Sequence, residues 1–293
     1  MRAASQRGTA YCLSTLSSVS IEDIAAIGNS PKWFQLYVWK DRGLVSDMLQ
    51  RAKSAGFDKL VLTVDFPLAG KRERDARNGF TIPPTLGVRQ VFEAVRRPGW
   101  SWDFVFGEPI RYANLSASTP AVSLADFVAE QLHAGFDWDD AEWVLDTWGG
   151  DAILKGVMRP SDAIRAKEMG FKAVSISNHG GRQLDGEVAP LDMLPAIRSA
   201  VGDDYALILD GGIRRGTDVL KAIALGADAV SFARPYLYGL AAAGFKGVSR
   251  ALEILADEVR LSMALLGVTT VSEITNEMVQ SLSVEREAGG GHK

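Results

Sequence analysis

The sequence predicts an α/β fold, a TIM (β/α)8 barrel that is incomplete, with seven recognisable strands. Seven short apolar runs alternate with amphipathic stretches, which indicates a parallel sheet covered by helices. Polar residues also gather at the carboxyl ends of all seven runs. A barrel places its active site at that end, whereas a doubly wound sheet concentrates its ligand at one crevice, so this distribution favours the barrel.

The elements follow one another as strand–helix repeats. The predicted strands are 10–14, 33–38, 59–63, 152–155, 173–177, 206–210 and 229–232, and the helices between them include 43–55, 161–169, 191–201 and 217–225. At Gly56, Gly170 and Gly226 an amphipathic stretch ends on glycine just before a strand. Glycine adopts the left-handed conformation that ends a helix, so this is the αβ half of a βαβ unit. A closed barrel needs eight strands, one more than this count.

A long interruption, 83–138, follows the third predicted strand. It carries Trp100 and Trp102 near Arg96 and Arg97, and it is too long for an ordinary connection. Two interpretations stay open: a partly ordered excursion on the barrel rim, or a segment that contacts a membrane or closes as a lid. We expect one barrel domain over 1–283 and a disordered glycine-rich tail over 284–293.

Composition narrows the function classes. The 293 residues include 32 Lys and Arg against 36 Asp and Glu, a net charge of −4, which argues against a nucleic-acid partner. The single cysteine, Cys12, cannot form an internal disulfide. Since we find neither a membrane-spanning apolar run nor a secretory signal, we expect a cytoplasmic enzyme.

One histidine stands directly after a buried strand, in Ser177-Asn178-His179-Gly180-Gly181-Arg182. The paired glycines let the backbone bend and bring His179 and Arg182 to the same mouth of the predicted barrel. Histidine accepts a proton near neutral pH, and arginine matches a carboxylate with a planar fork. The pair predicts proton abstraction from an anionic acid. The alternative is that His179 only bonds its own loop.

A second glycine turn, Asp210-Gly211-Gly212-Ile213-Arg214-Arg215-Gly216, opens a helix, and Ala233-Arg234 follows the last strand. Backbone amides, a helix N-terminus and an arginine indicate an anion site there, and barrels often hold phosphate between their last two strand loops. The alternative is that these glycines only make a tight turn.

Lys155 ends another strand and faces the barrel interior, where an unpaired ammonium is costly. Such a lysine indicates ligand binding or Schiff-base chemistry. A Schiff-base aldolase would use Lys155 but would leave His179 and Arg182 without a shared task.

These motifs resemble those of the FMN-dependent 2-hydroxy-acid dehydrogenases and oxidases, a family that includes L-lactate dehydrogenase, mandelate dehydrogenase and glycolate oxidase. The run from Ser177 to Asp185 looks like the family's active-site signature, and the resemblance extends from about Ala3 to about Ser283. The interruption is more similar to that of the membrane-associated lactate and mandelate dehydrogenases than to glycolate oxidase. Supporting matches are Trp33-Phe34-Gln35-Leu36-Tyr37-Val38, Leu62-Thr63-Val64-Asp65, Lys155-Gly156 and the glycine turn after Asp210.

The resemblance implies FMN as cofactor and His179 as the base, with Asp65 supporting its imidazolium. It implies that Lys155 stabilises the negative charge of the reduced flavin. The implied substrate-binding residues are Tyr37, Arg72, His179 and Arg182. The implied flavin contacts are Ser14, Gln35, Thr63, Lys155 and Ser177, and those to the ribityl chain and phosphate are Asp210, Gly211, Gly212, Ile213, Arg214, Ala233 and Arg234.

The sequence departs from the family pattern at two places, and each affects the expected stability or cofactor binding. Ala233 stands where the family has glycine, and the family's amino-terminal helices and first strand have no counterpart before Ala3. An absent first strand leaves two strand edges unpaired. We therefore expect weaker FMN binding and lower stability than in a full-length relative.

The leading hypothesis is FMN-dependent oxidation of an (S)-2-hydroxy acid, of L-lactate or mandelate type, to the 2-oxo acid. Electrons then pass to a quinone or cytochrome-like acceptor. The resemblance also implies a homo-oligomer and peripheral contact with the inner face of the cell membrane through the interruption. The alternatives are an oxidase that reduces oxygen to hydrogen peroxide, an inactive truncated barrel and the Schiff-base aldolase.

Overall fold

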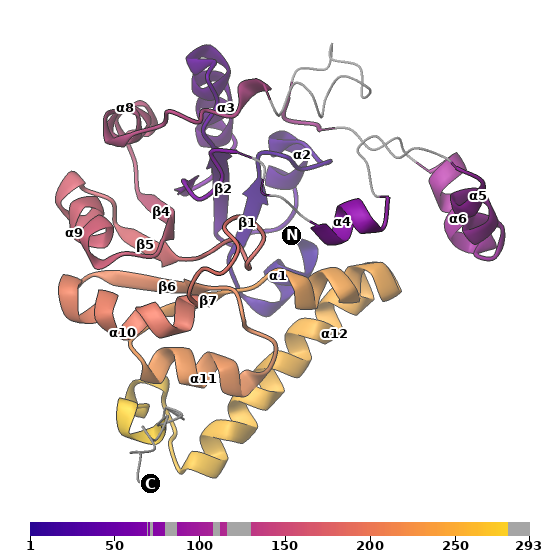
Figure 1. Cartoon of the computed structure of the whole chain (residues 1–293). Coiled ribbons are helices and arrows are strands. Elements are labelled where there is room, and N and C mark those ends of the chain that lie inside the picture. Colours follow the sequence, from indigo (N-terminus) through magenta and orange to yellow (C-terminus); the bar gives the residue numbers. More distant parts are fainter. Residues whose placement is uncertain (69, 71–72, 80–86, 108–111, 116–129, 281–293) are drawn as a thin grey trace, which may run out of the picture.

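The strands form one curled, fully parallel sheet, shown in Figure 1. The computed structural model describes residues 1–68, 70, 73–79, 87–107, 112–115 and 130–280. Neighbouring strands follow chain order from β1 to β7, without the reversal that defines a doubly wound sheet. All seven predicted strands are confirmed. They are β1 (Tyr11–Ser14), β2 (Lys32–Tyr37), β3 (Lys59–Thr63), β4 (Ala152–Val157), β5 (Ala173–Ile176), β6 (Ala206–Asp210) and β7 (Ala229–Ser231).

The four predicted helices are also confirmed, each within one residue of its expected bounds. They are α3 (Arg42–Ser54), α9 (Pro160–Met169), α10 (Pro190–Val201) and α11 (Gly216–Ala224). The side chain of Asp41 accepts a hydrogen bond from the Leu44 amide and so starts α3. The other helical segments are α1 (Arg2–Arg7), α2 (Ile21–Ala25), α4 (Glu73–Arg77), α5 (Val88–Val95), α6 (Pro98–Phe106), α8 (Trp138–Trp148), α12 (Arg234–Leu266), η1 (Val271–Glu273) and η2 (Asn276–Met278).

The two faces of the sheet have different cores. Leu60 and Leu62 belong to the large core that includes helix residues, whereas Val61 belongs to a separate small cluster. That cluster comprises Val61, Ile153, Ala173 and Ile208 from four neighbouring strands. Side chains two positions apart on a strand share a face, so Thr63, Lys155 and Asp210 lie on the same side as this cluster, one step nearer the carboxyl ends. An apolar floor thus underlies the polar strand ends.

The barrel is open. Within the described residues, β1 pairs only with β2, and β7 pairs only with β6. Asn114, from the long interruption, is buried against the carboxyl end of β1: its Oδ1 accepts from the Ile21 amide at 2.9 Å and its Nδ2 donates to the Ser14 and Thr15 carbonyls at 3.4 Å. A seven-stranded incomplete barrel is therefore confirmed.

Of the long interruption, the structure describes 87–107, 112–115 and 130–138. Helices α5 and α6 lie side by side and stand well away from the sheet in Figure 1. Arg72 and the predicted tail, 284–293, lie outside the described residues. None of the helices in the described ranges has both the length and the apolar character needed to cross a membrane.

Candidate active site

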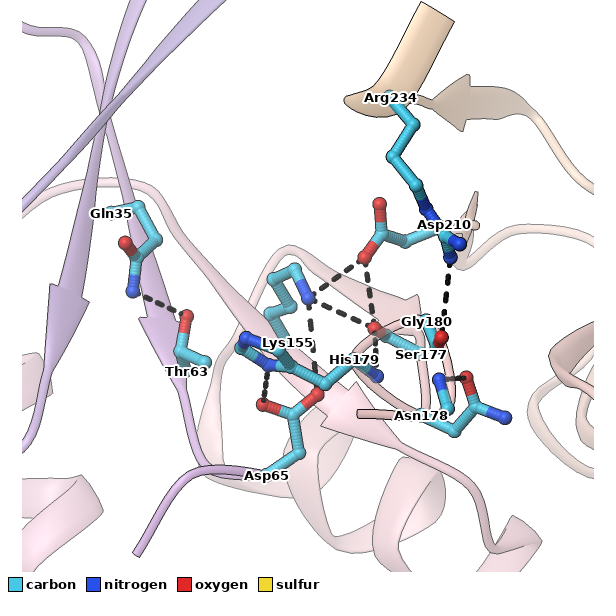
Figure 2. Close-up of polar contacts among 11 residues, drawn as sticks. Gln35, Thr63, Asp65, Lys155, Ser177, Asn178, His179, Gly180, Asp210 and Arg234 are labelled. Carbon is cyan, nitrogen blue, oxygen red and sulfur yellow. Dashed lines mark hydrogen bonds and ion pairs between the residues drawn. The ribbon is translucent and has the colours of Figure 1, made fainter. Parts of the chain in front are cut away.

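Two carboxylates and one hydroxyl, from three other strand ends, converge on Lys155, as Figure 2 shows. Its Nζ lies 2.8 Å from Asp210 Oδ2, 2.9 Å from Ser177 Oγ and 3.9 Å from Asp65 Oδ2. The Lys155 and Asp210 side chains keep only 17% and 16% of their surface exposed. One largely buried cation therefore sits between two carboxylates.

The charges in this group stabilise one another. Burial alone would lower the pKa of Lys155, but the negative charges of Asp210 and Asp65 outweigh it and raise that pKa. Burial would raise the pKa of Asp210, yet the Lys155 charge and hydrogen bonds from Lys155, Ser177 and Ser231 lower it. A Schiff-base nucleophile must be a neutral amine. The aldolase alternative therefore loses its support, because Lys155 is held as an ammonium.

A bulge in β4 brings Asp65 and Lys155 together. The pairing of β4 with β5 shifts register between Lys155 and Val157, and Gly156 between them has φ +103°. A Cβ at Gly156 would lie 2.7 Å from Asp65 Cβ, so only glycine lets Asp65 lie this close to β4. A glycine inside a strand often marks a bulge, so the sequence alone could have indicated a bulge at Gly156.

His179 faces Asp65 across this group. Its Nδ1 lies 2.8 Å from Asp65 Oδ1, and its ring stacks on Phe66 at a centroid distance of 5.5 Å, with the Tyr37 ring at 6.3 Å. A carboxylate on Nδ1 holds the proton there and leaves Nε2 as the basic nitrogen. The structure thus brings the predicted Tyr37, Asp65 and His179 together. The sequence offered no signal for Phe66, whose contact depends on the fold.

The backbone at His179 is strained. Its φ of +57° is positive, a conformation that costs an L-residue about 1–2 kcal/mol. The Ser177 hydroxyl accepts from the His179 amide at 3.1 Å while donating to Asp210 Oδ2 at 2.8 Å. One hydroxyl thereby links the histidine backbone to the Lys155–Asp210 pair.

The predicted flavin contacts on the first strands are close neighbours. Ser14 is paired in register with Gln35, and Gln35 Nε2 donates to Thr63 Oγ1 at 2.8 Å between two buried side chains (Figure 2). Thr63 is in turn paired in register with Lys155. These side chains and Ser177 form a continuous polar edge across five strands.

The predicted anion site lies beside this edge. Gly211 and Gly212 both have positive φ, and a Cβ on either would meet nothing within 4 Å. Arg234 begins α12 and its Nη2 donates to the Gly180 carbonyl at 3.2 Å. Ala233, with φ −124°, lies outside the left-handed region that favours glycine, so its backbone does not require the glycine of the family pattern.

Part of the predicted anion site is already occupied by carboxylates of this chain. The amides of Arg214 and Arg215 donate to Asp218 Oδ2, and the Gly216 amide donates to Glu258 Oε2. The side chain of Arg214 is exposed, and Ile213 is buried. Among the predicted phosphate contacts, this leaves the turn at Gly211 and Gly212 and the start of α12.

Arg182, predicted to bind the substrate carboxylate, is exposed three residues after His179. Its backbone packs closely against Gly70: a Cβ on Gly70 would lie 2.4 Å from the Arg182 carbonyl oxygen. The other predicted substrate arginine, Arg72, lies outside the described residues.

These residues fit a flavin mononucleotide. A polar edge of hydroxyl, amide and ammonium donors suits a ring system with carbonyl and nitrogen acceptors. The open glycine turn beside Arg234 suits a phosphate. Asp65 Oδ2, buried and without a hydrogen-bond donor, leaves acceptor capacity inside the site.

The chain is similar to proteins of one family over nearly its whole length. The profile of the family described as FMN-dependent dehydrogenase matches residues 1–281. The L-lactate dehydrogenase of Caulobacter vibrioides is 44% identical over 291 residues, covering 97% of this chain and 75% of that protein. That of Serratia proteamaculans is 44% identical over 288 residues, covering 96% and 75%.

Solved structures give the same result. A monotopic membrane protein, (S)-mandelate dehydrogenase, superposes with a TM-score of 0.91 at 37% identity and covers 95% of this chain and 74% of its own. A mandelate oxidase superposes with a TM-score of 0.75 at 40% identity, covering 94% and 70%. With the match over residues 1–281, the chain belongs to the FMN-dependent dehydrogenase family and uses FMN as its cofactor.

Proposed function

We propose that this chain oxidises an (S)-2-hydroxy acid of L-lactate or mandelate type to the 2-oxo acid. The observation that carries the proposal is the 2.8 Å contact between His179 Nδ1 and Asp65 Oδ1 beside the Lys155 ammonium. The relatives named L-lactate dehydrogenase and (S)-mandelate dehydrogenase support this substrate class.

In this proposal His179 is the general base. The oxidation breaks the C–H and O–H bonds at C2 and forms a C=O bond, and His179 Nε2 takes one proton while the other hydrogen leaves with the electron pair. FMN, when bound, would accept the electron pair together with this second hydrogen. Asp65 stabilises the imidazolium through the contact on Nδ1. Arg182 binds the substrate carboxylate and Tyr37 the hydroxyl, and Arg72 adds positive charge.

The remaining predicted residues hold the cofactor. Lys155 supplies a fixed positive charge where negative charge develops on reduction, a role that requires the ammonium form described above. Gly211, Gly212, Ala233 and Arg234 bind the phosphate. Ser14, Gln35, Thr63 and Ser177 contact the ring system, and Asp210, Ile213 and Arg214 the ribityl chain.

Anaerobic titration tests the proposal. The FMN-loaded chain should lose its oxidised flavin absorbance on addition of L-lactate or (S)-mandelate, with one flavin reduced per substrate oxidised. The matched control is the (R)-enantiomer, which should leave the absorbance unchanged. A flavin that binds but is bleached by none of a panel of 2-hydroxy acids would contradict this function.

The electron acceptor we propose is a quinone or cytochrome-like molecule. The alternative, oxygen, draws support from the similarity to mandelate oxidase. Hydrogen peroxide released in stoichiometric amount during aerobic turnover would favour the oxidase, and reduction of an added quinone without peroxide the dehydrogenase. The proposal includes a homo-oligomer, which sedimentation of the FMN-loaded chain measures.

We further propose that α5 and α6 contact a membrane surface. Trp102 and Phe106 pack ring to ring at 4.3 Å and remain 65% and 67% exposed, and Phe92 and Val95 are also exposed. Exposed apolar patches of this kind mark interaction sites, and aromatic side chains favour the lipid interface. The related (S)-mandelate dehydrogenase is described as a monotopic membrane protein.

Substituting both aromatics should weaken this contact. The double variant Trp102→Ser and Phe106→Ser should bind anionic phospholipid vesicles at least about tenfold more weakly, because it removes two large apolar side chains from the interface. Vesicle sedimentation measures the bound fraction. The control is Leu261→Ser with Leu265→Ser, two exposed leucines on α12, which should bind as the unaltered chain does. Equal weakening in both double variants would contradict the assignment to α5 and α6.

A further inference from the structure

The loop that carries His179 has an unusual backbone. His179, Gly180 and Gly181 have φ values of +57°, +71° and +69°, three left-handed residues in a row. In the described ranges, His179 is the one residue other than glycine with a positive φ. Because an L-residue resists this conformation, contacts elsewhere must hold His179 in it.

The side chain of Asn178 makes those contacts at both ends of the turn. Its Oδ1 accepts from the Gly181 amide at 3.1 Å, and its Nδ2 donates to the Val188 carbonyl at 3.1 Å (Figure 2 shows the first). The Gly181 amide also reaches the Asn178 carbonyl at 3.0 Å, which closes the turn. The first bond closes the left-handed turn, and the second connects the turn to Val188, seven residues further along the loop.

Asn178 is well placed to act as a fixed support. Only 8% of its surface is exposed, and Ser177 before it is completely buried. Within the described residues, the hydrogen bonds of the Asn178 side chain go to backbone groups and not to the His179 ring, Lys155 or Asp65. A buried amide with both ends satisfied restricts the loop to one geometry.

We propose that Asn178 is a positioning residue that holds His179 in the left-handed conformation from which its ring reaches Asp65. The inference rests on the proposed function, since it matters for turnover only if His179 is the base. Without the amide, the turn relaxes toward the ordinary backbone region and the imidazole leaves the carboxylate and the Phe66 ring. A misplacement of about 1 Å in a catalytic group can lower a rate by about 100-fold.

The experiment compares FMN-loaded variants of the full chain. Asn178→Ala should lower kcat by about 30- to 100-fold with KM little changed and FMN retained, because the base is displaced while the substrate site stays. Asn178→Ser should recover part of that loss, because its hydroxyl can still accept from the Gly181 amide. Hydrogen exchange at the Gly181 amide, which donates to Asn178 Oδ1, should quicken by at least about tenfold in Asn178→Ala, since the turn opens more often.

Arg198→Ala is the matched structural control. Arg198 also ties loop carbonyls, those of Gly202, Tyr205 and Gly226, but at the amino ends of β6 and β7, away from the site. Its loss should lower the melting temperature and leave kcat unchanged. A fall in kcat of equal size in Arg198→Ala would show a general stability effect and overturn the assignment.

A double-substitution cycle separates this inference from the proposed function. If Asn178 acts through His179, then adding Asn178→Ala to His179→Asn should cause no further loss of kcat. A further loss equal to that of the single variant would overturn the positioning role, as would unaltered exchange at the Gly181 amide. If His179→Asn alone kept full activity, the proposed base would be wrong, while the exchange rates would still report whether Asn178 holds the turn.

Discussion

His179→Asn should lower kcat/KM for the 2-hydroxy acid by about 10³- to 10⁴-fold, because a positioned general base contributes up to that factor. Asparagine is the informative replacement, since it tolerates positive φ better than other residues and so keeps the backbone at φ +57°. The rate of flavin reduction under anaerobic conditions, followed by absorbance, measures the loss directly.

The same assay contains its control. His133→Asn changes a histidine outside the site and should leave the reduction rate unchanged. FMN content should be equal in both variants, because the His179 side chain contacts Asp65 and the aromatic rings of Phe66 and Tyr37 and not the predicted phosphate site. A reduction rate within about tenfold of the unaltered chain would remove His179 from the role of base.

Lys155→Met should lower the free energy of unfolding at pH 7 by about 3 kcal/mol, within the range observed when one partner of a buried ion pair is removed. The methionine leaves Asp65 and Asp210 close together without the ammonium that now lies 2.8 Å from Asp210. The variant should also bind FMN more weakly. Urea unfolding of the cofactor-free chain isolates the stability effect.

The free energy of unfolding should depend on pH through Asp210 and Lys155, in a direction that their pKa shifts define. The lowered pKa of Asp210 adds stability that is present above the ordinary carboxyl value of 3.8 and is lost as the pH falls through the lowered pKa. The raised pKa of Lys155 adds stability that is full below 10.5 and is lost as the pH rises through the raised pKa. In Lys155→Met the burial of Asp210 disfavours its charged form, so the deficit against the unaltered chain should shrink between pH 7 and pH 4.

Lys59→Met is the matched control for this result. Lys59 pairs with Asp151 at 2.8 Å, but both side chains are partly exposed, and such pairs contribute about 0–1 kcal/mol. A deficit for Lys155→Met no larger than that of Lys59→Met, or one that does not vary with pH, would show that the Lys155 group carries no special stability.

Local patterns were sufficient to predict the strand order and the polar strand ends. Helix-ending glycines and apolar runs lie within a few residues of each other, so Gly56, Gly170 and Gly226 marked three strands directly. Strand alternation then places Lys155 and Asp210 on the concave side without any knowledge of distant contacts. The resemblance added roles for these positions, and the family it named is confirmed.

What local patterns could not predict depends on residues distant in the chain. Phe66 reaches the His179 ring, and Asn114 reaches β1, across about a hundred residues of sequence. The carboxylates of Asp218 and Glu258 close the start of α11, although the glycine turn alone suggested open amides. Nothing in the sequence pattern distinguishes these partners before the strands are assembled.

The Ser177 hydroxyl accepts from both the His179 amide and Lys155 Nζ while donating to Asp210. The proposed base, His179, and the proposed flavin-binding lysine, Lys155, are therefore linked through one hydroxyl. If these roles hold, a substitution that moves Lys155 will displace His179 as well, so combined substitutions of the two residues will depart from additivity. Substitutions meant to alter the substrate specificity or the reduction potential of the flavin are best made at residues that do not contact the Ser177 hydroxyl.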